Sequence, residues 1–146
     1  MKNIPLCICL LLLVLQSCKS KEDETIAIKA LLEKESATWR SGDVAAHAAC
    51  WQVQPYSRIL VSAGNGEVYD VPPENMIKAS EGMGKGGSSR NSNYKWAIHR
   101  NTGWVSHSEL STSETGLQTN SFEIRFVEKI KGSWKLVGQS IHILKQ

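Results

Sequence analysis

The sequence has few of the residues that mark a disulfide scaffold, a metal site or a membrane-spanning helix. Three of its four cysteines fall within the first 18 positions, so the rest of the chain holds only Cys50 and has no partner for an intrachain disulfide. It has no Cys-x-x-Cys pair, and no two histidines stand one helical turn apart, so we expect no metal ion or other cofactor. The longest apolar run, residues 4–15, falls short of the ~20 residues that span a bilayer.

Charge of one sign is not concentrated anywhere along the chain. The 17 basic and 14 acidic residues nearly balance, and Lys and Arg form no continuous stripe. Proteins that bind nucleic acids concentrate positive charge on one face or along one helix, so we expect no nucleic-acid partner. Serine and threonine residues are scattered without a nucleophile motif, which disfavours covalent catalysis.

The N-terminus, in contrast, carries a strong signal. Lys2 precedes the apolar run and small or polar residues follow it, an order typical of an export signal. The run ends in Leu15-Gln16-Ser17-Cys18, which resembles the lipobox of bacterial lipoproteins, whose cysteine is acylated and becomes the first residue of the mature protein. The resemblance implies a signal peptide over residues 1–17, a lipid on Cys18 that holds the protein in the membrane, and a location in the bacterial cell envelope. An ordinary cleaved signal peptide and a retained anchor are the two alternatives.

Beyond the signal we expect a short tether and one domain. Removing 17 of the 146 residues leaves 129, enough for one hydrophobic core and too few for two ordinary domains. In this interpretation residues 18–24 form the lipidated, charged tether and residues 25–146 form the domain. The charges at residues 21–24 resemble the export signal of surface lipoproteins in Bacteroidetes; a solvated tether explains them equally well.

The first part of the domain has the patterns of helices. Residues 24–39 show apolar positions close to helical spacing, which predicts an amphipathic helix. Gly42 suits the left-handed C-cap of that helix, and Asp43 suits the N-cap of a second helix that runs through Trp51. A third, short helix is expected over residues 72–80, with proline in its first turn.

The remaining segments have the patterns of strands and turns. A β-hairpin is expected from residues 58–63 and 67–71, and four further strands follow at residues 94–101, 104–111, 119–129 and 133–144. Residues 82–93 are rich in glycine and serine, which predicts a mobile loop. Their formal Gly-x-Gly-x-x-Gly follows a helix and precedes a strand, the reverse of a dinucleotide-binding fingerprint. Helices first and a long antiparallel meander last predict an α+β domain.

The order of these elements resembles the nuclear transport factor 2-like superfamily. The resemblance rests on Gly42-Asp43 between two helices, and on the closing runs Glu123-Ile124-Arg125 and Gly132-Ser133-Trp134-Lys135-Leu136. It covers about residues 22–144 and is greatest to the small SnoaL-like domains common in Bacteroidetes. It implies a cone-shaped curved antiparallel sheet wrapped around three N-terminal helices, with a cavity at the wide end and a homodimer formed through the outer sheet face. Because this superfamily holds enzymes, binding domains and many members without known function, the resemblance implies a fold and not an activity.

The resemblance also disfavours steroid-isomerase chemistry. Ketosteroid isomerases place a tyrosine on the first helix and a carboxylate base after the second helix. Counted from Gly42-Asp43, those positions fall on Glu35 and about Ile59 in this chain. Other members carry a histidine late in the last strand, where the register gives Ser140; His142 lies two residues further on, on the same strand face.

Strand alternation assigns faces to several polar residues. In the strand at residues 119–129 we expect Phe122, Ile124 and Phe126 to face the core, which leaves Glu123 and Arg125 outward or at a dimer surface. Three further candidates lie on neighbouring strands. These candidates are His99, His107 and Glu109. If they converge inside the cone, they can bind metal or relay protons. We favour an outward placement, because mixed polar faces usually meet water or a partner.

The second helix offers one more candidate. Asp43, His47 and Trp51 follow one another at one-turn intervals and can share a helix face. One interpretation is a pocket histidine with Trp51 as an aromatic wall; the other, which we favour, is a capping aspartate, a hydrogen-bonded histidine and a core tryptophan. Cys50 lies in a small apolar stretch, and we expect it to be buried.

Five tryptophans are many for a domain of this size, and they suggest an aromatic-lined cavity. We expect the cavity to be lined by Trp51, Tyr56, Trp96 and Trp104 and to bind a small apolar or aromatic ligand without catalysis. One alternative is a lyase, cyclase or hydrolase that uses His47 or His142 as acid and base, with Arg125 or Tyr56 orienting the substrate. The other is a protein-interaction module whose outer sheet face recruits an envelope protein.

Overall fold

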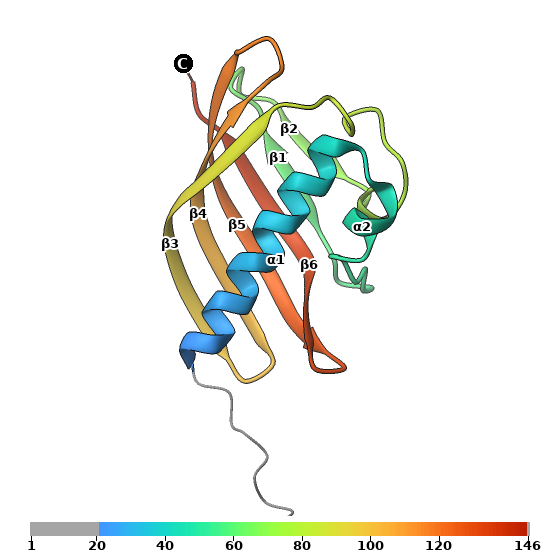
Figure 1. The fold of residues 1–146 in the computed structure, drawn as a ribbon, viewed down its shortest axis with the longest axis vertical. Helices are drawn as coiled ribbons and strands as arrows, with labels where there is room; N and C mark the ends of the chain where they lie inside the picture. The colour runs from blue at the N-terminus through green and yellow to red at the C-terminus, as the bar shows by residue number, and fades with distance from the viewer. Residues whose placement is uncertain (1–20, 146) are drawn as a thin grey trace, which may run out of the picture.

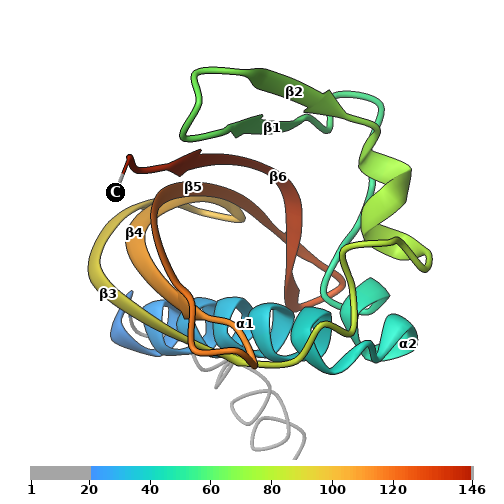
Figure 2. The ribbon, with the colours of Figure 1, turned by 90° about the horizontal axis from the view of Figure 1, so that it is seen from above.

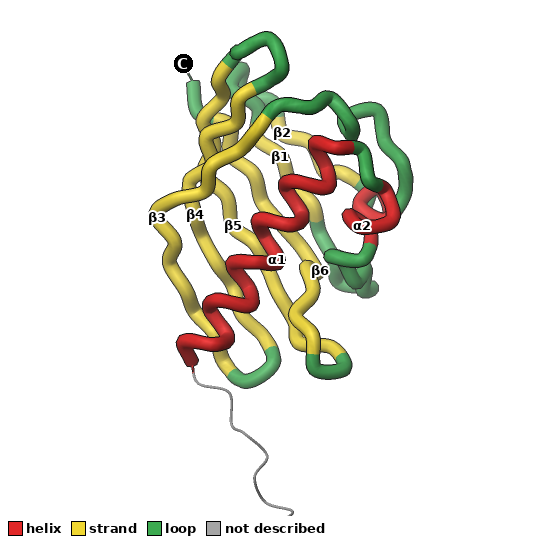
Figure 3. The backbone as a smooth tube through the Cα atoms, in the orientation of Figure 1, coloured by secondary structure: helices red, strands yellow, loops and turns green. Residues whose placement is uncertain are grey.

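One long helix, α1 (Lys21–Ser41), lies across the concave face of a strongly curved sheet (Figures 1 and 2). The computed structural model describes residues 21–145, so the predicted signal at residues 1–17 and Cys18 lie outside the described residues. Figure 3 shows the helical elements gathered on one side of the sheet, as expected for an α+β fold. No helix in the described part of the chain is long and apolar enough to cross a membrane.

The six strands form a single sheet in the order β2-β1-β6-β5-β4-β3. Every neighbouring pair is antiparallel except β1 and β6, which run parallel because the chain crosses over between the first hairpin and the final meander. The predicted hairpin and all four later strands are present. Their bounds are β1 (Ile59–Ser62), β2 (Val68–Val71), β3 (Ser88–His99), β4 (Thr102–Thr112), β5 (Gln118–Ile130) and β6 (Ser133–Ile143).

The junction after α1 forms as its sequence predicts. Gly42 adopts φ 74°, and the amides of Gly42 and Asp43 donate to the carbonyls of Trp39 and Thr38, which is the hydrogen-bond pattern of a Schellman C-cap. The Asp43 side chain then accepts a hydrogen bond from the Ala46 amide at 3.0 Å and caps the next helix.

Two predicted helices are shorter than expected. The second helix, α2 (Val44–Ala48), does not reach Trp51, because Trp51 leaves the helix to form a β-bridge with Leu136 on β6. The third is the 3₁₀-helix η1 (Pro73–Ile77). Tertiary pairing with the sheet therefore ends α2 earlier than its local sequence does.

The predicted loop at residues 82–93 is also shorter than expected. Strand β3 begins at Ser88, and its first residues pair with the end of β4. A β-bulge between Ser92 and Lys95, where Asn93 has φ 57°, bends the strand around α1. Polar residues can form this strand because it is the edge of the sheet and one side of it faces water.

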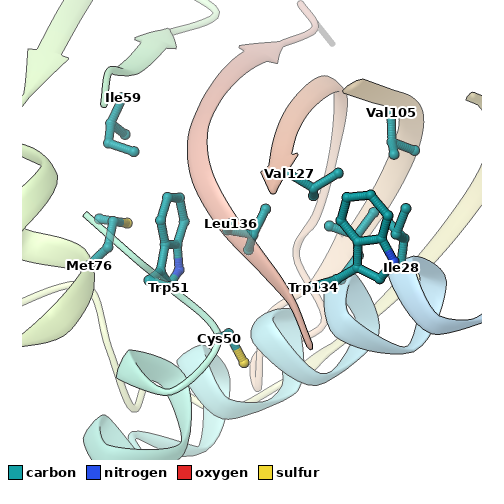
Figure 4. Close-up of a cluster of buried hydrophobic side chains, with 10 residues drawn as sticks. Ile28, Cys50, Trp51, Ile59, Met76, Val105, Val127, Trp134 and Leu136 are labelled. Carbon is teal, nitrogen blue, oxygen red and sulfur yellow. The ribbon is translucent and has the colours of Figure 1, made fainter. Parts of the chain in front are cut away.

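The hydrophobic core lies between α1 and the strongly curved part of the sheet (Figure 4). Ile28 and Leu32 of α1 pack there with the side chains of β4, β5 and β6, and Glu24 fixes the start of α1 by accepting hydrogen bonds from Lys129 and Trp134. Cys50 is buried, as predicted. The other buried members of the cluster are Trp51, Ile59, Met76, Val105, Val127, Trp134 and Leu136.

Candidate functional site

The inner face of β5 is the opposite of the one predicted. Glu123 and Arg125 are buried inside the cone, whereas Phe122 and Phe126 are exposed on the outer face. The prediction was wrong because it assigned the more apolar side of the strand to the interior. At Glu123 and Arg125 the interior is a polar site in which charged groups pair with one another, whereas Phe122 and Phe126 lie on the outer face.

Arg125 is the centre of this interior. Its guanidinium donates hydrogen bonds to Glu123 on the same strand and to Gln139 on β6, and its Nη1 lies 3.5 Å from Glu35 Oε2 on α1. Ser121 Oγ donates to the other oxygen of Glu123 at 2.9 Å. Because all of these side chains are buried, the positive charge of Arg125 offsets the cost of placing two carboxylates away from water.

Glu35 also joins the network to α2 through His47. His47 is fully buried; its Nε2 lies 3.1 Å from Glu35 Oε1 and its Nδ1 lies 2.9 Å from the Met76 carbonyl oxygen. A carbonyl oxygen only accepts, so Nδ1 donates to it. The contact between Nε2 and the carboxylate then requires one further proton, which the two groups share.

A second ion pair lies towards the C-terminal end of α1. Arg40 Nη2 contacts Glu109 Oε1 on β4 at 2.5 Å, and Ser36 Oγ donates to Glu109 Oε2 at 3.1 Å. The side chains of Arg40 and Glu109 are mostly buried, so this pair is only weakly screened by solvent. The helix and β4 are therefore joined by charge as well as by apolar packing.

Burial and neighbouring charges move the pKa values of these groups in different directions. Burial alone would raise the pKa of Glu35, but the charge of Arg125 and the hydrogen bond from His47 outweigh it and hold this pKa below its ordinary value. The pKa of Glu109 is raised by burial and by the charge of Glu123, which together outweigh Arg40. The pKa of His107 is lowered by burial and by Arg125, so His107 is held neutral.

A cavity of about 420 Å³ opens beside these charged groups. One side of it is apolar and is formed by side chains of α1, β1, β2, β6 and η1: Trp39, Ile59, Val61, Val71, Met76, Ile141 and Ile143. The other side is polar and comes mainly from α1, β4 and β5: Glu35, Ser36, Arg40, Glu109, Ser111, Thr119, Ser121, Glu123, Arg125 and Gln139. The cone is thus hollow, and the hollow has two chemically distinct sides.

The predicted acid and base residues do not line this cavity. His47 lies behind Glu35 and reaches the cavity only through that carboxylate. His142 lies on the other face of β6 from Ile141 and Ile143, where its Nε2 contacts Ser140 Oγ at 2.9 Å. His142 shares a face of β6 with Ser140, the position that the resemblance gives, and this face points away from the cavity.

The four aromatic residues expected to line the pocket lie elsewhere. Trp51 packs in the core, with its ring centroid 6.4 Å from that of His47, and Trp96 stacks on Tyr94 at 5.2 Å. Trp104 lies on the outer sheet face, and Tyr56 is exposed and donates hydrogen bonds to Glu128. Trp39 is the tryptophan that lines the cavity.

The three strand candidates divide between the two faces. His107 and Glu109 point inward, contrary to the outward placement that we favoured, whereas His99 is exposed near the end of β3. His107 Nε2 lies 3.7 Å from Glu123 Oε2, and neither ring nitrogen has a hydrogen-bond partner within residues 21–145. Among the same residues, no group of three or more His, Cys, Asp or Glu side chains is arranged to hold a metal ion.

Sequence reasoning missed the residues that dominate the site. The sequence patterns indicate Glu35 only as the position where an isomerase has tyrosine. They place Glu123 and Arg125 outward or at a dimer surface, and Arg125 is a candidate only as a substrate-orienting residue in the enzyme alternative. One signal was available, because Glu123 and Arg125 stand two residues apart and therefore share a strand face, as a buried ion pair requires. Nothing in the linear sequence indicated their partners on α1.

Comparisons with known proteins show the fold. No protein-family model and no curated protein matches this chain. A solved NTF2-like protein from Cytophaga hutchinsonii is similar over 86% of this chain and 100% of its own, with 20% identity and a TM-score of 0.65. An NTF2-like protein of unknown function from Shewanella baltica covers 88% and 99%, with 12% identity and a TM-score of 0.63. A proposed dehydratase of the NTF2-like family from Streptomyces avermitilis covers 87% and 100%, with 10% identity and a TM-score of 0.69.

Proposed function

From the lipobox-like residues 15–18, the NTF2-like fold and the cavity inside its cone, we propose a cell-envelope lipoprotein that binds a small molecule in that cavity. The observation that carries the proposal is the two-sided lining of the 420 Å³ space, with apolar side chains facing a charged, hydrogen-bonding wall. Pockets of this size with a few placed polar groups are the usual form of small-molecule sites. The lining favours a ligand with an apolar or aromatic body and one polar end.

Binding without turnover is favoured by the way in which the polar groups are engaged. Both oxygens of Glu109 and of Glu123 accept hydrogen bonds from protein side chains, and Glu35 is held by His47 and Arg125. Each of these contacts stabilises the ionised carboxylate and so opposes its taking a proton from a substrate, as a general base must. The carboxylate oxygens can still accept hydrogen bonds from a ligand, which suits recognition.

Acid–base catalysis is the second candidate function. It is favoured by the Glu35–His47 pair, which shares a proton at the edge of the cavity, and by the fold likeness to a proposed dehydratase. In this candidate Glu35 exchanges the proton with the ligand and His47 replaces it. A lyase, a cyclase or a hydrolase would use such a step.

The decisive experiment identifies what the cavity holds. We would purify the protein from its native host, extract the small molecules that co-purify with it and identify them by mass spectrometry. The Val61→Trp variant fills the cavity from β1 and should lose the molecule, whereas Leu60→Trp, whose side chain lies on the other face of the same strand, should retain it. Equal retention by both variants, or no molecule above the blank in the wild type, would contradict the proposal.

The same preparation separates binding from catalysis. A molecule that is recovered unchanged after prolonged incubation with fresh protein supports a binding role. Conversion to a new product, abolished by Glu35→Gln and unaffected by the surface change Glu33→Gln, supports the enzyme. The two glutamates lie two residues apart on α1, one buried and one exposed, so they form a matched pair.

The lipid anchor has its own test. Cys18→Ala should move the protein from the detergent phase to the aqueous phase and remove the mass of the lipid, whereas Cys50→Ala, at a buried cysteine, should leave partitioning unchanged. Aqueous partitioning of the wild type would sink this part of the proposal and leave the cavity unaffected.

A further inference from the structure

The charges around the cavity form a closed set. Five charged side chains line it: the guanidinium groups of Arg40 and Arg125 and the carboxylates of Glu35, Glu109 and Glu123. Counted as ionised, they leave one negative charge over. The proton shared by His47 and Glu35 cancels that charge, and His107, held neutral by its lowered pKa, adds none.

The balance holds pair by pair as well as in total. Arg40 pairs with Glu109, Arg125 pairs with Glu123, and His47 shares its proton with Glu35. No charged group among the residues that line the cavity therefore has surplus charge to offer a ligand. A charged ligand buried here would have to lose its hydration without gaining a counter-charge, which costs several kcal/mol in proteins.

We infer that the cavity selects an uncharged ligand, one with an apolar body and a neutral hydrogen-bonding end such as a hydroxyl or carbonyl group. This inference rests on the proposed small-molecule role and narrows its ligand class. The apolar wall from Val61, Val71 and Ile141 takes the body, and the polar wall takes the end. Because that wall holds both donors and acceptors, a neutral hydroxyl or carbonyl group finds a partner there without disturbing any ion pair.

Three ring compounds of equal skeleton test this selection on the full-length protein. The probes are 2-naphthol, 2-naphthoate and 2-naphthylmethylamine, which are neutral, anionic and cationic at pH 7, and calorimetric titration measures their affinities. The wild type should bind 2-naphthol at least about tenfold more tightly than either charged probe, since tenfold corresponds to only about 1.4 kcal/mol, less than the cost of an uncompensated buried charge.

Two variants should then reverse the selection in opposite directions. Glu109→Gln leaves Arg40 without its counter-charge and should raise the affinity for 2-naphthoate relative to 2-naphthol by about tenfold or more. Arg40→Gln leaves Glu109 and should do the same for 2-naphthylmethylamine, measured at pH 8 because the pKa of Glu109 is raised and loss of Arg40 raises it further. The exposed pair Arg58–Asp70 on the first hairpin supplies controls of equal charge, because Arg58→Gln and Asp70→Asn should leave all three affinities unchanged.

The possible results distinguish the selection for an uncharged ligand from the small-molecule role on which it rests. If the wild type binds a charged probe as tightly as 2-naphthol, and Val61→Trp abolishes that binding, the selection for uncharged ligands is overturned and the small-molecule role is kept. Failure of all three probes to bind at millimolar concentration overturns both. If either cavity variant fails to fold, the comparison of the three probes on the wild type still decides the question.

Discussion

At the scale of single residues, Arg125 holds the interior of the cone together. It contacts side chains from α1, its own strand and β6, and both of the carboxylates it contacts are buried. An arginine can do this because its planar guanidinium presents several donors in fixed directions, which a lysine ammonium does not.

Replacing Arg125 with methionine should therefore destabilise the protein strongly. The change leaves Glu35 and Glu123 buried without their counter-charge, and breaking a buried pair in this way costs about 3–5 kcal/mol. Urea denaturation of Arg125→Met against wild type measures the loss. Arg58→Met, at an exposed ion pair, is the matched control and should change stability little. Equal, small effects at both positions would show that the network adds nothing to stability.

His107 should make stability depend on pH. Its pKa in the folded protein is lowered by burial and by Arg125, so below the unfolded value of about 6.5 the unfolded chain binds a proton that the folded chain does not. The free energy of unfolding should therefore fall as the pH drops from about 6.5 towards the lowered value. His107→Phe should flatten the denaturation midpoint between pH 7 and pH 5, whereas the exposed His99→Asn should keep the wild-type profile.

Few of these residue roles were predictable. Alternation alone puts Glu123 and Arg125 on one face and Phe122 and Phe126 on the other, but it is symmetric and does not say which face is inside. Their hydrophobicity led us to assign the face with Phe122 and Phe126 to the interior. The choice failed because a counter-charge from α1, more than eighty positions away, makes the polar face suitable for burial.

At the scale of elements, sequence signals were accurate where the interactions that fix a boundary lie within a few residues. The end of α1 at Gly42 and the cap at Asp43 form as predicted, because a left-handed glycine and a side-chain acceptor act within a few residues. The C-terminal end of α2 and the start of β3 differ from the prediction, because pairing with β6 and β4 decides them.

Replacing Gly42 with alanine should destabilise the junction between α1 and α2. Its φ is 74°, and a Cβ added there would lie 3.0 Å from the Gly84 Cα, so alanine meets both backbone strain and a steric contact. Gly116, in the turn between β4 and β5, has φ 82° and open space around it. Gly42→Ala should lower the free energy of unfolding by about 2 kcal/mol and Gly116→Ala by about 1 kcal/mol, as measured by thermal denaturation. The reverse order would contradict the close packing of Gly42 on Gly84.

At the scale of the whole molecule, the outer face of the sheet is the remaining feature to explain. Trp104, Phe122 and Phe126 are 42%, 39% and 46% exposed, and Trp104 and Phe126 are cross-strand neighbours on β4 and β5. Contiguous apolar side chains on a sheet face usually mark an interaction surface. The homodimer implied by the resemblance would cover this face, and a two-fold interface would use the same residues from both copies.

Phe126→Glu should accordingly shift the protein from dimer to monomer. A carboxylate on this face, beside Trp104 of the neighbouring strand, would be buried in the dimer without a counter-charge, which is costly. Sedimentation velocity over a tenfold or wider range of concentrations measures the change. Leu117→Glu, at an exposed residue of the turn between β4 and β5, should leave the dimer intact. A wild-type protein that stays monomeric would contradict the dimer.

Local sequence patterns are sufficient to predict the order and type of the elements. Helical spacing in α1, the Gly42–Asp43 junction, the turn at residues 64–66 and period-two alternation in the last strands act over a few residues, so they can be read locally. The tertiary structure alone decided which sheet face is interior and what chemistry it holds. Glu35, His47 and Arg125 come from three different elements, and only their approach allows charges to be buried in pairs beside an open cavity.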